Sequence, residues 1–136
     1  MESLISLSES KARADERITG FRQMFGAVLA IEALFALWLL ATSLGKFGLT
    51  EIEVAGISPG LTGVMLLWAI LFQVVGFFDP IRNRLPVVIG VLGRYLVGGV
   101  ALCLELWVVG SIAIGIGLAL NFTYHATVRA IVMARP

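Results

Sequence analysis

Four apolar runs, each close to the length that crosses a lipid bilayer, restrict the fold of this chain more than any other feature. They cover about residues 25–44, 60–78, 85–106 and 111–132. A helix needs about 20 predominantly apolar residues to span the hydrocarbon core. We therefore expect an all-α membrane protein, in which residues 24–136 form one transmembrane domain. Its four helices would make a bundle in up-down-up-down order.

The composition agrees with this class and excludes others. Hydrophobic residues make up 59% of the chain and charged residues 14%, whereas a soluble domain has about 25% charged residues. The net charge of +1 gives no electrostatic support for binding nucleic acid. The single cysteine, Cys103, cannot form an internal disulfide and lies in an apolar run. We expect it to be a buried and unreactive thiol.

Residues 1–23 are polar and precede the first run. Ser6 and Glu9 have the spacing of a capping box, which starts helices, and apolar residues recur along one side from Leu4 to Phe21. The segment is therefore expected to be a short amphipathic helix at the cytoplasmic surface. A disordered tail is the alternative, because short isolated helices are marginal in water.

Basic residues in short loops indicate how the helices are oriented, because such loops stay in the cytoplasm. Only Lys46 lies on one side of the expected membrane. The other side carries Lys11, Arg13, Arg17, Arg22, Arg82, Arg84, Arg129 and Arg135. Both termini are thus expected to be cytoplasmic. In a bacterium this places the protein in the inner membrane.

Each run contains one strongly polar residue at a similar depth. With a rise of 1.5 Å per residue, these residues lie roughly 9–13 Å from the cytoplasmic end of their helices. A charge at the centre of a membrane helix costs about 2.5–3.5 kcal/mol, so Glu32 and Arg94 are expected to form an ion pair. The pair would belong to a polar pocket that opens toward the cytoplasm. Its predicted members are Glu32, Gln73, Arg94, Asn121, His125 and Arg129. The alternative is a salt bridge that only orients the helices.

Small residues predict where the helices come close. Gly90 and Gly98 stand four residues before and after the arginine and leave room for its side chain. Ser111, Gly115 and Ala119 recur every four residues along the last run. Faces of this kind allow membrane helices to pack tightly.

His125 is the only histidine. An axial bond to haem or another pigment is conceivable, but a hydrogen-bonded polar residue is the ordinary role. Zinc and di-iron centres need several histidine and carboxylate ligands. We expect neither a metal site nor a cofactor.

Two short segments resemble the small multidrug resistance transporters. The first is residues 26–32, Gly-Ala-Val-Leu-Ala-Ile-Glu, and the second is the hairpin from Gly76-Phe77-Phe78 to Leu85-Pro86-Val87-Val88-Ile89-Gly90. The resemblance implies a four-helix dimer in which Glu32 exchanges protons and cations. The chain departs from that family in two ways. Its hairpin lies between the second and third spans instead of at the end, and Arg94 would neutralise the glutamate.

Three classes of function remain open. The first is an accessory or structural subunit of a larger membrane complex. Small size, small-residue faces and the lack of a catalytic constellation favour it over an enzyme. The second is a small homo-oligomeric, proton-coupled transporter that uses Glu32. The third is an intramembrane enzyme acting on a lipid or isoprenoid, with Glu32 and His125 as acid and base and Arg94 holding an anionic group. Partners would be the bilayer and either other subunits or further copies of the chain.

Overall fold

The part of the chain that the structure describes forms four long helices. The computed structural model describes residues 2–43 and 59–134, and their side chains from residue 8 onward. The helices are α1 (Glu2–Ser43), α2 (Pro59–Phe78), α3 (Arg84–Cys103) and α4 (Trp107–Met133). Each is long and apolar enough to cross a membrane. The chain is thus a small multi-pass membrane protein. Lys46 and Arg135, which contributed to the predicted orientation, lie outside the described residues.

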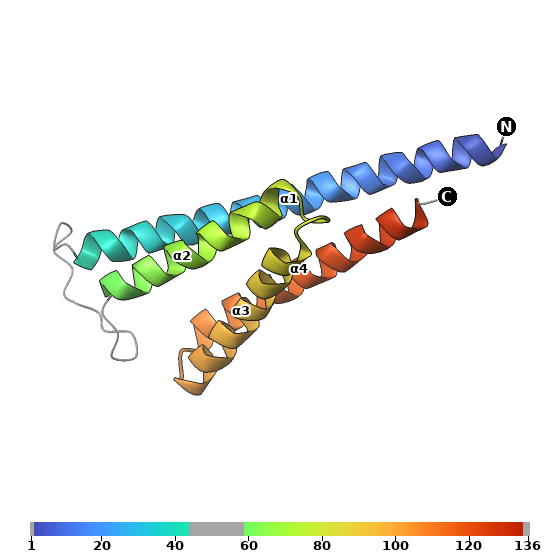
Figure 1. Ribbon diagram of the computed structural model, residues 1–136. Helices are drawn as coiled ribbons and strands as arrows, with labels where there is room; N and C mark the ends of the chain where they lie inside the picture. The colour runs from blue at the N-terminus through green and yellow to red at the C-terminus, as the bar shows by residue number, and fades with distance from the viewer. Residues whose placement is uncertain (1, 44–58, 135–136) are drawn as a thin grey trace.

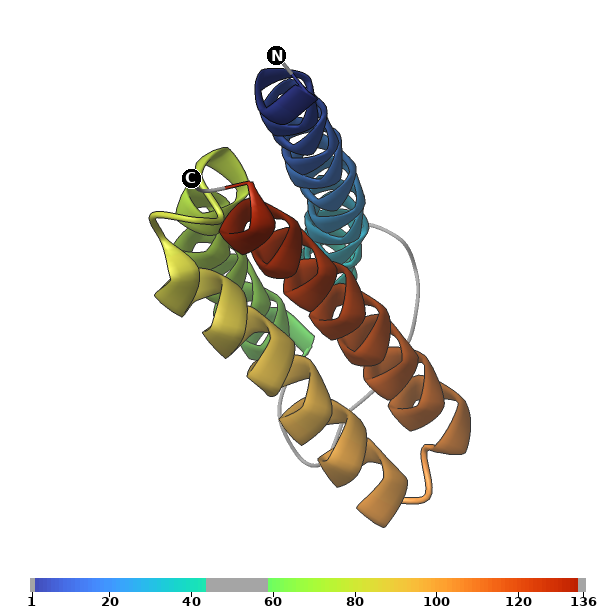
Figure 2. The same cartoon turned by 90° about the vertical axis from the view of Figure 1, so that its right-hand side faces the viewer.

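The helices pack as two hairpins, α1 with α2 and α3 with α4. The hairpins join where α1 meets α4 and α2 meets α3. Both chain ends lie at one end of the bundle, which we call the terminal end (Figure 1). The hairpins diverge toward the opposite end, which we call the open end, as both views show (Figures 1 and 2).

An aromatic core closes the bundle toward the terminal end. Phe21 and Phe25 of α1 stack with their ring centroids 5.5 Å apart, and Tyr124 of α4 lies 5.5 Å from Phe21. Val87 and Leu120 are fully buried in the same cluster. Many other large apolar side chains are exposed, Trp68 at 76% among them. Lipid is the solvent that such a surface fits.

α1 is one continuous helix through the segment that was expected to form a separate interfacial helix. It already begins at Glu2, before the capping box at Ser6. From Ala14 onward the apolar side of this segment is buried at Ala14 and Phe21, and Phe21 packs against Tyr124 of α4. The hydroxyl of Thr127 also donates a hydrogen bond to the Arg17 carbonyl oxygen, 3.3 Å away. These contacts stabilise the part of α1 that precedes the apolar run, so that the two parts form one helix.

The turn between α3 and α4 lies earlier than predicted. α3 ends at Cys103 and α4 begins at Trp107, whereas the hairpin was expected at Gly110-Ser111. Glu105 has a φ of 62°, in the left-handed region that forms such turns. The stretch from Leu106 to Ile112 is almost wholly apolar and gives no sign of a turn. Glu105, just before it, is the polar residue that could have predicted where the turn lies. Cys103, expected to be buried, is exposed at the end of α3.

Candidate functional site

An ion pair between the first and third helices is the centre of the candidate site. The Arg94 Nη2 atom donates a hydrogen bond to Glu32 Oε2 at 2.8 Å. The side chain of Arg94 is 7% exposed and that of Glu32 is 23% exposed. The carboxylate therefore lies at the edge of the bundle interior, and the guanidinium lies within it.

Two more contacts fix the guanidinium and bring in the second helix. Its Nη1 atom donates to Gln73 Oε1 at 2.9 Å and to the Gly90 carbonyl oxygen at 2.7 Å. The Gln73 amide nitrogen in turn donates to the Ala69 carbonyl oxygen at 3.2 Å. The Arg94 guanidinium carbon lies over the ring of Phe25, 6.0 Å from the ring centroid. One arginine thus ties α1, α2 and α3 together.

Gly90 leaves room for the Gln73 side chain in this arrangement. A Cβ atom at this position would collide with the Gln73 side-chain oxygen. The missing side chain therefore gives the amide its place between α2 and α3. Gly90 was expected to leave room for the arginine, but the group that it accommodates is the glutamine amide.

Arg94 keeps one hydrogen-bond donor unused. Its Nε atom is buried and has no partner among the described residues. A buried donor without an acceptor costs about 1–3 kcal/mol.

A groove runs from this pair toward the open end, between the two hairpins. It has a volume of about 990 Å³ and receives side chains from all four helices. Large apolar residues such as Phe35, Trp68 and Phe72 form its walls. Glu32, Gln73 and Arg94 are its polar residues and lie at the end nearest the aromatic core. The predicted pocket would have opened toward the termini, but the aromatic core closes that side.

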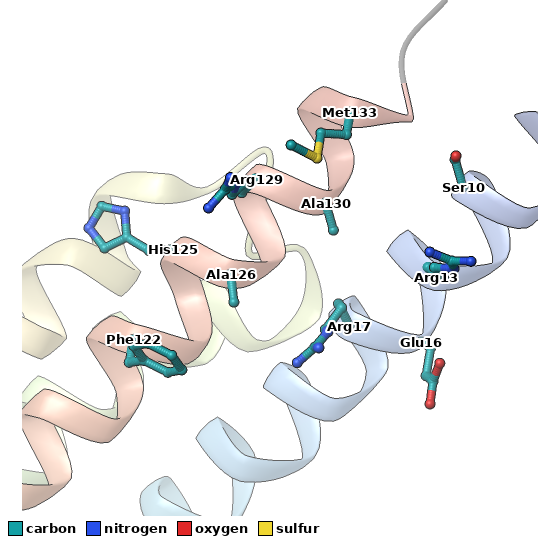
Figure 3. A pocket seen from close by; sticks show the side chains of 10 residues that line it. All are labelled: Ser10, Arg13, Glu16, Arg17, Phe122, His125, Ala126, Arg129, Ala130 and Met133. Carbon is teal, nitrogen blue, oxygen red and sulfur yellow. The ribbon is translucent and has the colours of Figure 1, made fainter.

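α4 does not bring its polar residues to the pair. His125 and Arg129 line a separate cleft beside Arg13 and Arg17 (Figure 3). Asn121 is half-buried and borders neither the groove nor that cleft. The cause is the helical phase of α4. Asn121 and His125 each follow a buried residue by one position, which turns their side chains by about 100°.

The small residues of α4 also divide between two faces. Gly98 of α3 packs against Gly110 of α4, and a Cβ on either would lie about 3 Å from the other's carbonyl oxygen. Ser111, Gly115 and Ala119, which were predicted to pack, are exposed instead. The face that packs against α3 is the neighbouring one, which begins at Gly110.

Among the described residues, no group of three or more histidine, cysteine, aspartate or glutamate side chains is placed to hold a metal ion. Glu32 and His125 lie in different cavities. Comparison with protein-family models, with curated proteins and with solved structures finds no match. The geometry of the ion pair and the groove is therefore the basis for assigning a function.

Proposed function

We propose that this chain is an accessory subunit of a larger membrane assembly, and that the groove between its hairpins receives a transmembrane helix of a partner polypeptide. One observation supports this proposal above the others. The hairpins diverge and leave a groove of about 990 Å³, apolar along its walls and polar at its inner end. A partner helix could cover both regions at once.

The walls of the groove contain small residues at which another backbone could come close. Ala69, Gly93 and Ala113, from three different helices, line it. A Cβ atom placed on Gly93 would meet nothing within 4 Å. Membrane helices associate where small residues allow close approach, because apolar side chains gain little by leaving lipid for one another.

The polar end of the groove supplies a reason for one helix to fit better than lipid. Glu32 is part-exposed there, and a carboxylate that faces hydrocarbon is unfavourable. A serine, threonine or asparagine on the partner could donate a hydrogen bond to it, a contact worth roughly 1–2 kcal/mol in membranes. The partner's polar residue would then set the register of the complex.

Filling the groove should remove the partner while the fold persists. Gly93→Phe is expected to abolish co-purification of a polypeptide present in fixed ratio from the native membrane in mild detergent. Gly99→Phe is the matched control. It lies on the same helix in equally open space but outside the groove, so the complex should survive.

Cross-linking identifies what occupies the groove. A photoreactive residue in place of Phe72, which lines the groove, should capture the co-purified polypeptide. One in place of Phe78, an exposed phenylalanine of α2 outside the groove, should capture only lipid. Capture of a second copy at Phe72 would indicate a homo-oligomer. Recovery of the protein alone, or of the same complex with Gly93→Phe, would contradict the proposal.

The geometry favours this function over the two alternatives. A proton-coupled transporter needs Glu32 to exchange its partner, and here Arg94 neutralises it at 2.8 Å while Gln73 and Gly90 hold the arginine. An acid–base enzyme needs His125 beside Glu32. His125 instead lines a cleft together with Arg17. Arg17 and Glu32 are both on α1 and lie about 22 Å apart along it.

We also propose that both termini face the cytoplasm, in a bacterium from the inner membrane. The basic residues of the terminal end carry this proposal, since short basic loops are retained inside. A reporter enzyme that is active only in the cytoplasm should work when fused at either terminus. Activity of a periplasm-specific reporter at the C-terminus would refute the orientation.

A further inference from the structure

A second cavity lies at the terminal end, between the first half of α1 and the last turns of α4 (Figure 3). Its volume is about 770 Å³. It is separate from the groove, because the two cavities share no lining residue. A ligand in this cavity would therefore not touch the groove that the partner helix is proposed to fill.

The cavity is basic. Arg13 and Arg17 line it from α1, Arg129 and His125 line it from α4, and Glu16 is the one acidic side chain among the described residues that line it. Glu9 approaches Arg13 at 3.8 Å, but both side chains are mostly exposed, and such pairs contribute little. Figure 3 shows the Arg17 side chain extending from α1 toward α4. The cleft therefore has a surplus of positive charge.

The frame of the cleft is fixed by buried contacts. Thr127 is 1% exposed, and its hydroxyl is shared between the Thr123 carbonyl oxygen on its own helix, at 2.8 Å, and the Arg17 carbonyl oxygen of α1, at 3.3 Å. Ala14 and Tyr124 are buried beside it. α1 and α4 are thus held apart at a set distance, and the arginines project from rigid helices.

Apart from Ser10, the rest of the lining is apolar and continues toward the membrane. Ala126 and Ala130 line the cleft from α4 and are small enough to leave space beside the helix. Phe122, one turn further toward the hydrocarbon, is 77% exposed. The cavity thus combines guanidinium groups with an apolar track that leads into the bilayer.

We infer that this cleft binds one anionic phospholipid, whose phosphate-bearing headgroup contacts Arg17 and Arg129 and whose acyl chain follows Ala126 and Phe122. Arginine suits this role because its planar fork donates two hydrogen bonds to a phosphate. Basic pockets between membrane helices are known binding sites for anionic headgroups. A phosphate free in solution would gain the charge contacts but not the apolar track.

The test uses the full-length protein in nanodiscs of phosphatidylcholine, with and without phosphatidylglycerol. Native mass spectrometry should show one phosphatidylglycerol retained after release from the mixed nanodiscs. Arg17→Gln with Arg129→Gln should weaken retention about 30-fold, since each basic residue contributes about fivefold. Lys11→Gln with Arg82→Gln removes the same charge from exposed residues outside the cleft, and should change retention by less than about twofold.

A second variant keeps the charge and fills the apolar track. Ala126→Leu should weaken retention of phosphatidylglycerol while every arginine remains. If the two double charge variants lose retention of phosphatidylglycerol equally, the attraction is a diffuse property of the surface and the inference is wrong. The inference is also wrong if neither double variant changes retention. Competition with inorganic phosphate is the remaining measurement. If it competes with the lipid at equal concentration, the site binds free anions and the lipid assignment is wrong.

Discussion

Replacing Arg94 with alanine should lower the free energy of unfolding by about 3–5 kcal/mol, which is the cost of removing one partner from a buried pair. The change leaves the Glu32 carboxylate in the bundle with no counter-charge. It also removes the Nη1 group, which donates hydrogen bonds to the Gln73 side-chain oxygen and to the Gly90 carbonyl oxygen. The loss should be measurable by circular dichroism during titration with a denaturing detergent.

A double variant separates the charge from the shape. Glu32→Met with Arg94→Met removes both charges and keeps side chains of similar length, so most of the stability should return. Replacing buried ion pairs by apolar residues is often neutral or stabilising. If the double variant loses as much stability as the single variants Glu32→Met and Arg94→Met added together, the pair is not coupled.

The same double variant tests whether the pair does more than hold the helices. A folded Glu32→Met, Arg94→Met protein that still binds its partner would show that the pair is only structural. A folded protein that loses its partner would show that the exposed side of Glu32 contributes to recognition. This distinction matters because the groove brings the carboxylate to the surface that the partner would cover.

The Glu32–Arg94 contact could be predicted because few alternatives existed. Both residues stand near the middle of apolar runs at matching depth, and a charge in lipid needs a partner. The depth follows from the sequence through the fixed rise of a helix. Gln73 joined them for the same reason, since its depth also matched and an amide can accept from a guanidinium.

The residues of α4 could not be predicted in the same way, because depth along a helix does not determine the side on which a residue lies. Asn121, His125 and Arg129 form a polar face, but the bundle buries Leu120, Tyr124 and Thr127 beside it. An error of one position turns a helix face by about 100°. Aromatic packing of Tyr124 against Phe21 decides the phase, and that contact joins residues far apart in the chain.

The early start of α4 has a similar explanation. Its first residues are as apolar as the end of α3, so hydrophobicity gives no boundary between them. The turn could fall at several positions. It falls at Glu105, and this start places Gly110 opposite Gly98 so that the two backbones come together.

That close contact leads to the second large effect. Gly98→Leu should lower the free energy of unfolding by about 3 kcal/mol, near the upper end of what an overpacked site costs. The first added carbon would already lie 2.6 Å from the Ile114 side chain and 3.0 Å from the Gly110 carbonyl oxygen. The backbone oxygen cannot rotate away as a flexible side chain could. The α3–α4 hairpin would therefore have to separate.

Gly99→Leu is the control that isolates this contact. It adds the same side chain one position along, where nothing lies within 4 Å, and it gains the same helix propensity over glycine, about 1 kcal/mol. The two variants, compared by the same detergent titration, should differ by the cost of the clash alone. Equal stabilities would mean that α3 and α4 do not approach at Gly98, and the position of the groove between the hairpins would then have to be reconsidered.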